Sequence, residues 1–233
     1  MTESSQNISS TPVLAAVVLA GGASRRMGQD KAQLQRPDGQ TQLSFTCDVA
    51  RRCGADPVWV SLASPDKTEA QHSDRICTLV DAFPDSGPIA GIASALAAAG
   101  SAAQPHSPIQ SRPTHLLVLP CDLPYLNPEA LAPLLEGLTP DLEEQAPDLG
   151  EQAPSQNTTR AYQQHYLPCV IADIENAKIV ADEILRKQEN LSIRAFLSEL
   201  GAIFIEPDDT AKQALINTNA PGDWQQFINN FSE

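Results

Sequence analysis

Hydrophobic positions along the chain fall into short runs that alternate with longer segments of helical periodicity. A short apolar run rich in Val, Ile and Leu is typical of a buried strand, whereas apolar residues that recur every three to four positions indicate a helix. In the first part of the chain this pattern predicts strands at Val13–Ala20, Asp56–Ala63, Ile76–Val80 and His115–Leu119. The segments between and after them predict helices at Gln42–Cys53, Ile89–Ala99 and Pro128–Leu138.

The same alternation resumes towards the C-terminus. An apolar stretch, Tyr166–Ile171, precedes predicted helices near Asn176–Lys187 and Ser192–Leu200, a strand at Ala202–Ile205 and a final helix from about Pro221. Strands that alternate with helices favour a parallel sheet with helices on both faces. We therefore predict an α/β fold of three layers, α/β/α, around a mostly parallel open sheet.

Two segments depart from this pattern. Residues 1–11 are polar and lack the basic start and apolar core of a signal peptide, so we expect a disordered N-terminus. Residues 139–158 are acidic and contain a tandem duplication, Pro-Asp-Leu-Glu-Glu-Gln-Ala followed by Pro-Asp-Leu-Gly-Glu-Gln-Ala. Such a segment has too little apolar surface to order itself, and we expect a mobile insertion in a single domain that spans residues 12–233.

The most informative loop follows the first predicted strand. The run Val17-Val18-Leu19-Ala20 ends at Gly21-Gly22, and Arg25, Arg26, Gly28 and Lys31 follow. Glycines after a strand let the backbone approach a ligand, and backbone N–H groups in such a turn can bind an anion. The spacing fits neither the dinucleotide fingerprint nor the P-loop. It predicts that this loop and its cations bind a polyphosphate.

Asp81 and Asp122 follow the third and fourth predicted strands. In open α/β sheets ligands bind at the carboxyl ends of the strands, which is where these two residues and Gly21-Gly22 would meet. Asp122 lies between Pro120 and Pro124, which restrict the turn, and a carboxylate beside a phosphate loop is the expected Mg²⁺ ligand. Lys31 and Arg26 are the candidates for stabilising phosphate charge.

The charge and the cysteine content limit the classes of ligand and the cellular compartment that are compatible with the sequence. The 233 residues carry a formal net charge of −14, which argues against nucleic-acid binding. Four of the fifteen basic residues, Arg25, Arg26, Lys31 and Arg36, fall in one short window, as expected for a small anionic ligand. The five cysteines are scattered, which fits a reducing cytoplasm, and the longest apolar run is too short to span a membrane.

The motif Leu19-Ala20-Gly21-Gly22-x-Ser24-x-Arg26-Met27-Gly28-x-Asp30-Lys31 resembles the signature of small nucleotidyltransferases with a GT-A-like fold, similar to nucleotide-diphospho-sugar transferases. Its LAGG form is most similar to the molybdenum cofactor guanylyltransferases. Three further motifs follow in that family's order: Asp81 before Gly87-Pro88-Ile89-Ala90-Gly91, then Pro120-Cys121-Asp122-Leu123-Pro124, then Asn217-Thr218-Asn219-Ala220-Pro221-Gly222-Asp223.

The resemblance implies an enzyme that transfers GMP from GTP to the terminal phosphate of molybdopterin, releases pyrophosphate and uses Mg²⁺. Acceptor molybdoenzymes or their chaperones would be its candidate protein partners. It implies catalytic roles for Lys31, Arg26 and Asp122, with Asp122 as the metal ligand. The implied nucleotide-binding residues are Leu19, Ala20, Gly21, Gly22, Lys31, Asp81, Gly91, Asp122, Asn217 and Asn219.

Two alternatives stay open. The family usually has an asparagine near the base or ribose after the second strand, and Val60-Ser61-Leu62-Ala63-Ser64 has none. A cytidylyltransferase acting on molybdopterin or another small phosphorylated acceptor is therefore a rival interpretation. A nucleotide-binding regulator without catalysis is another, although the presence of both Lys31 and Asp122 favours an enzyme. Cys121 is expected to be a small buried hydrophobic residue.

Overall fold

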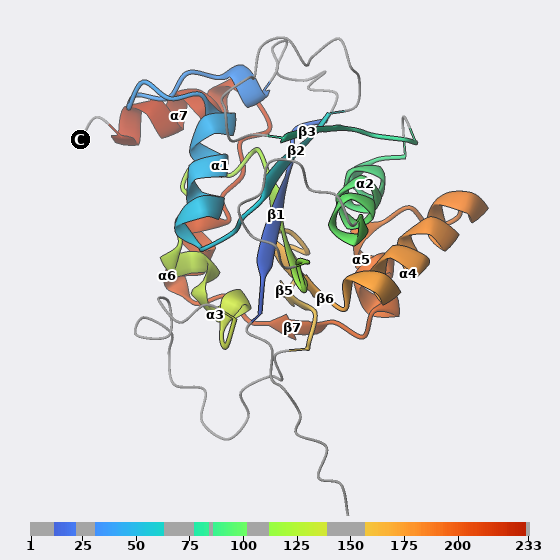
Figure 1. Cartoon of the computed structure of the whole chain (residues 1–233). Coiled ribbons are helices and arrows are strands. Elements are labelled where there is room, and N and C mark those ends of the chain that lie inside the picture. Colours follow the sequence, from blue (N-terminus) through green and yellow to red (C-terminus); the bar gives the residue numbers. More distant parts are fainter. Residues whose placement is uncertain are drawn as a thin grey trace, which may run out of the picture.

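The computed structural model describes residues 12–21, 31–62, 77–83, 86–101, 112–138 and 157–231. In these parts of the chain a seven-stranded sheet has the order β3-β2-β1-β4-β6-β5-β7 (Figure 1). The strands are β1 Leu14–Leu19, β2 Val58–Leu62, β3 Cys77–Val80, β4 His115–Pro120, β5 Arg160–Tyr162, β6 Cys169–Ala172 and β7 Ile203–Ile205. β1 pairs in parallel with β2 and β4, and β2 with β3, whereas β6 runs antiparallel to β4 and β5.

Helices cover both faces of this sheet, so the predicted three-layer α/β/α fold with a mostly parallel sheet is confirmed. Figure 1 shows α1, α6 and α7 on one side and α2, α4 and α5 on the other. Their bounds are α1 Gln42–Arg52, α2 Pro88–Gly100, α4 Ile174–Lys187, α5 Ile193–Glu199, α6 Asp209–Ala214 and α7 Pro221–Phe231. A short 3-10 helix, η1, spans Lys31–Gln33.

The two cores follow from the alternation of side chains along β1. Ala16 and Val18 pack with α1, while Ala15 and Val17 pack with α2 on the opposite face. All four are completely buried, because a central parallel strand has helices over both faces. This explains why the sequence shows a continuous apolar run here rather than an alternation of apolar and polar residues.

The prediction of one helix over Pro128–Leu138 is wrong. The segment forms a 3-10 helix, η3 Glu129–Leu131, and then a single α-helical turn, α3 Ala132–Leu135. Pro133 has no N–H to donate to Glu129, so a continuous helix cannot form. Gly137, with φ +75°, ends the turn.

The sequence prediction lacks three short elements, η1, β5 and α6. Strand β5 is only three residues long, and α6 has six residues and begins after its cap Asp208. Elements this short have too few positions to show a period. Residues 1–11, and residues 139–156 of the insertion expected at 139–158, lie outside the described residues. Among the helices of the described ranges, none combines the length and apolar character needed to cross a membrane.

Candidate active site

The site lies at the carboxyl ends of neighbouring parallel strands. Leu19, the last residue of β1, is level with Ser61 of β2 and with Pro120 of β4. The chain therefore leaves β1 at Gly21 between the end of β2 and the end of β4. Gly22 and Arg26 of the expected phosphate loop lie outside the described residues, so their assigned roles stay predictions.

Lys31, Asp122 and Asn219 are brought together at this edge. The Lys31 ammonium, Nζ, lies 3.5 Å from Asp122 Oδ2 and donates a hydrogen bond of 2.9 Å to Asn219 Oδ1. The side chain of Lys31 is 19% exposed and that of Asp122 is 28% exposed. Both charges are thus partly removed from water but still accessible to a ligand, which strengthens any electrostatic interaction that they make.

The C-terminal segment reaches the site through backbone contacts. The buried Thr218 donates its backbone N–H to the Asp122 carbonyl oxygen over 2.9 Å. Asp223 in the first turn of α7 accepts hydrogen bonds of 2.8 Å from the backbone N–H groups of Asn219 and Ala220. These bonds, with the charge of Lys31, lower the pKa of Asp223. Asn219 is therefore held by the start of α7, while Asn217 is exposed two residues earlier.

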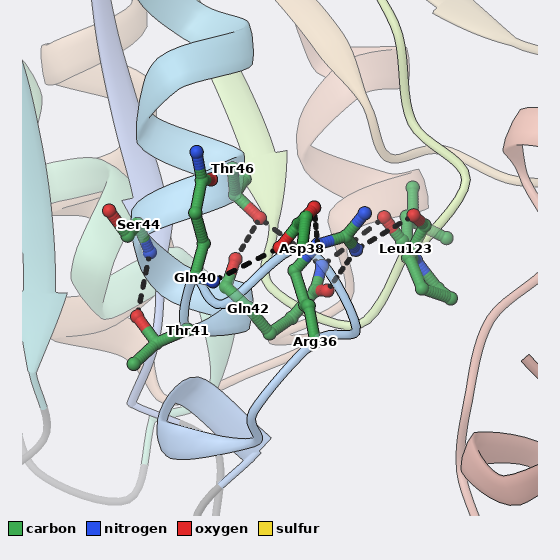
Figure 2. Close-up of polar contacts among 9 residues, drawn as sticks. Arg36, Asp38, Gln40, Thr41, Gln42, Ser44, Thr46 and Leu123 are labelled. Carbon is green, nitrogen blue, oxygen red and sulfur yellow. Dashed lines mark hydrogen bonds and ion pairs between the residues drawn. The ribbon is translucent and has the colours of Figure 1, made fainter. Parts of the chain in front are cut away.

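Arg36 has a different role from that suggested by the basic window. Arg36 is 5% exposed, and its guanidinium donates hydrogen bonds of 2.9 Å to Gln42 Oε1 (Figure 2) and to the Pro124 carbonyl oxygen. It pairs with Asp38 at 3.1 Å and lies 3.5 Å from the centre of the Phe45 ring. Burial lowers its pKa, and Asp38 offsets this in part.

Arg36 is therefore an internal anchor rather than a ligand-binding cation. Gln42 extends the anchor, because its Nε2 donates a hydrogen bond of 3.3 Å to the Leu123 carbonyl oxygen. In Figure 2 the side chains of Arg36 and Gln42 both point towards the Leu123 segment. Together they fix the loop that immediately follows Asp122. Cys121, on the other side of Asp122, is buried, which confirms the prediction for this thiol.

A second cluster lies on the other side of β1. The Ser61 hydroxyl in β2 donates a hydrogen bond of 2.6 Å to Asp81 Oδ1 just after β3. Burial raises the pKa of Asp81, and the bond from Ser61 lowers it in part. Gly91 of α2 packs directly against Ser61: a Cβ at Gly91 would overlap Ser61 Oγ and lie 2.9 Å from Leu19 Cδ2. Gly91 thus supports the site by allowing this close approach.

Two contributors, Ser61 and Asp223, have no role in the sequence prediction, although Asp223 closes the last of the four motifs. Ser61 is the one polar residue in the buried strand Val58–Leu62, which was a signal that the sequence did offer. Asp223 follows Pro221-Gly222 at the start of a helix, a position where an acidic residue commonly caps backbone N–H groups. Ala20 continues the pairing of β1 with β2, since its backbone N–H donates a bond of 3.1 Å to the Ser61 carbonyl oxygen. The nucleotide-binding roles of Leu19 and Ala20 stay predictions.

A bound Mg²⁺ is compatible with the side chains present. Within the described residues no three His, Cys, Asp or Glu side chains gather as a metal cage. Mg²⁺ does not require one, because it is often held by one or two carboxylates together with waters and substrate phosphates. The partly exposed carboxylate of Asp122 is such a donor.

The family model described as MobA-like NTP transferase domain matches residues 16–203. The chain belongs to this family. It is accordingly a nucleotidyltransferase domain, and Lys31, Asp81, Gly91 and Asp122 lie inside the matched region, whereas Asn219 lies beyond it.

Similar proteins agree with this assignment. The molybdenum cofactor guanylyltransferase of Xanthomonas euvesicatoria is 29% identical over 91% of this chain and 93% of its own length. Other curated relatives align over 42% to 56% of their length. Molybdopterin-guanine dinucleotide biosynthesis protein A of Archaeoglobus fulgidus has a TM-score of 0.65 at 19% identity, covering 94% of this chain and 98% of that one. A cytidylyltransferase for 2-C-methyl-D-erythritol 4-phosphate from Thermus thermophilus scores 0.61 at 16% identity, covering 95% and 100%.

Proposed function

We propose that the protein transfers GMP from GTP to the terminal phosphate of molybdopterin in an Mg²⁺-dependent reaction in the cytoplasm. The observation that carries the proposal is the Lys31–Asp122–Asn219 cluster at the carboxyl ends of β1 and β4, in a chain of this family. The similarity to the Xanthomonas guanylyltransferase over nearly the whole length supports the choice of GTP and molybdopterin. The five cysteines are scattered along the sequence without a C-x-x-C pair, which suits a reducing compartment.

In the proposed reaction an oxygen of the molybdopterin phosphate attacks the α-phosphorus of GTP. The bond from this phosphorus to the bridging α–β oxygen breaks, and the electron pair leaves with pyrophosphate. The second pKa of a phosphate monoester is about 6, so the nucleophile is already ionised at neutral pH and needs no general base. The work left to the protein is positioning and charge stabilisation.

The side chains divide this work. Asp122 would hold Mg²⁺, which when bound neutralises charge at the α-phosphate. Lys31 is the cation placed to interact with the phosphates, and its bond to the Asn219 amide oxygen keeps it at the site. Asp81, which follows β3 beside the end of β2, would contact the nucleoside. Arg36 and Gln42 hold the loop after Asp122 in place.

The experiment is a pyrophosphate-release assay with purified protein, molybdopterin and each of the four nucleoside triphosphates. We expect release with GTP, and Asp122→Asn is the matched inactive control. Turnover with CTP and none with GTP would contradict the proposal in favour of a cytidylyltransferase. GTP binding without pyrophosphate release would favour the regulator.

A further inference from the structure

Ser61 is a polar residue in an otherwise apolar, fully buried strand. Its residue is 1% exposed, between neighbours of β2 that are equally buried. A buried hydroxyl costs stability unless it is hydrogen-bonded. Its bond of 2.6 Å to Asp81 Oδ1 has the length typical of a hydroxyl donating to a charged carboxylate. The hydroxyl of Ser61 in β2 is therefore hydrogen-bonded to the site residue Asp81.

The backbone fixes Asp81 as well. In the parallel pairing of β2 and β3, Leu62 is level with Val80, and Asp81 N–H donates a 3.0 Å bond to the Leu62 carbonyl oxygen. The main chain of Asp81 is thus set by the sheet, and its side chain is set by Ser61. The carboxylate cannot rotate freely without losing the bond from the hydroxyl.

Gly91 makes this arrangement possible from the helix side. The face of Ser61 is covered by α2, and the absence of a side chain at Gly91 leaves the room that Ser61 Oγ occupies. A side chain at Gly91 would therefore displace the Ser61 hydroxyl from Asp81. Three segments, β2, the end of β3 and the first turn of α2, thus act together on one carboxylate.

We propose that Ser61 is a positioning residue for nucleotide recognition: it holds the carboxylate of Asp81 so that Asp81 Oδ2 accepts a hydrogen bond from an N–H or O–H group of the nucleoside. This inference rests on the proposed function, in which Asp81 contacts the nucleoside. It assigns to the Ser61 hydroxyl the orientation of that contact, and to Gly91 the space that the hydroxyl needs.

The test compares Ser61→Ala with Ser94→Ala. Ser94 lies on α2, and its hydroxyl donates to the Ala90 carbonyl oxygen, so the control removes a similar hydroxyl that does not contact Asp81. The dissociation constant is measured by calorimetry for each nucleoside triphosphate, together with kcat and KM for the one that is turned over. We expect Ser61→Ala to weaken binding and raise KM about tenfold, the loss expected for one hydrogen bond to a charged group. Its kcat should stay within about twofold of the wild-type value, since only nucleoside binding is affected.

A double-mutant cycle supplies the decisive comparison. If Ser61 acts through Asp81, Ser61→Ala adds no further loss of affinity to Asp81→Asn. Additive losses, or a Ser61→Ala protein that binds as tightly as Ser94→Ala, would overturn the inference. If the wild type uses CTP rather than GTP, the proposed function fails, and the same cycle with CTP still decides the role of Ser61.

Discussion

The substitution Arg36→Ala distinguishes two interpretations of Arg36, an internal anchor that stabilises the fold and a cation that binds the ligand. Alanine removes the hydrogen bonds of 2.9 Å to Gln42 and Pro124, the ion pair of 3.1 Å with Asp38 and the ring contact of 3.5 Å with Phe45. It also leaves the buried Gln42 Oε1 and Pro124 carbonyl oxygen without the hydrogen bonds that Arg36 donates to them. If Arg36 is an internal anchor, its loss should lower the free energy of unfolding of the protein. If it were a surface cation that binds phosphate, its loss should lower only the affinity for the nucleotide.

The magnitude follows from these contacts. A hydrogen bond from a charged group stabilises by about 1.5–3 kcal/mol, and a desolvated cation–π contact by about 2 kcal/mol. The sum overestimates the effect, because alanine also removes the desolvation cost of the buried guanidinium. We expect a net loss of about 3–5 kcal/mol, the range for breaking a buried charged network. That corresponds to a decrease in Tm of roughly 10 °C in a domain of this size.

The assay is urea unfolding followed by the fluorescence of the two tryptophans, Trp59 and Trp224, both of which are buried. Arg51→Ala is the matched control, because Arg51 makes a surface ion pair with Asp48 whose loss should cost less than about 1 kcal/mol. The interpretation would be refuted if Arg36→Ala were as stable as Arg51→Ala while its KM for GTP rose.

Lys31→Ala should lower kcat and kcat/KM together in the pyrophosphate assay, by roughly 2–4 kcal/mol in barrier, and wild-type rates would contradict its role. Asp122→Asn should reduce kcat by at least about 100-fold without recovery at high Mg²⁺, since the amide carries no charge for the metal; a normal kcat at saturating Mg²⁺ would exclude it as the ligand. Gly91→Ala should cost about 1–3 kcal/mol of folding stability in thermal denaturation, and less in a Ser61→Ala background, because the overlapping hydroxyl is gone; equal costs would show that the strain lies elsewhere. Asp81→Asn should raise Tm at neutral pH. Because the pKa of Asp81 is raised in the folded protein, its ionisation lowers the stability of the fold as the pH increases above the ordinary pKa of 3.8. The gain from asparagine should therefore vanish below that pH. An unchanged Tm at pH 7 would speak against a destabilised Asp81.

The sheet and the edge that carries the site were predictable from local pattern. Buried parallel strands appear as continuous apolar runs, and their carboxyl ends lie together whatever the helices do. Asp81 and Asp122 were located in this way. The break in the helix predicted at Pro128–Leu138 also has a local cause, Pro133. The sequence alone does not indicate whether the packed turn tolerates this proline.

The remaining details depend on contacts between distant residues. The sequence does not indicate that Arg36 would turn inward, because that depends on Pro124 and on Phe45 being close to it. Nor does it indicate that Asn219, rather than Asn217, would contact Lys31. Strand β5 forms because β6 and β7 supply partners on both sides, and a three-residue segment contains no such information by itself.

The hydrogen bond between Lys31 and Asn219 joins residues 188 positions apart. The contact therefore depends on the packing of the C-terminal segment against the sheet, because no local structure can bring these two residues together. The strands β1 and β4 can therefore be paired while the cluster of Lys31, Asp122 and Asn219 is still open. Detachment of α7 would release the backbone N–H groups of Asn219 and Ala220 from Asp223 without unfolding β1 or β4, an opening that hydrogen exchange would report separately from global unfolding.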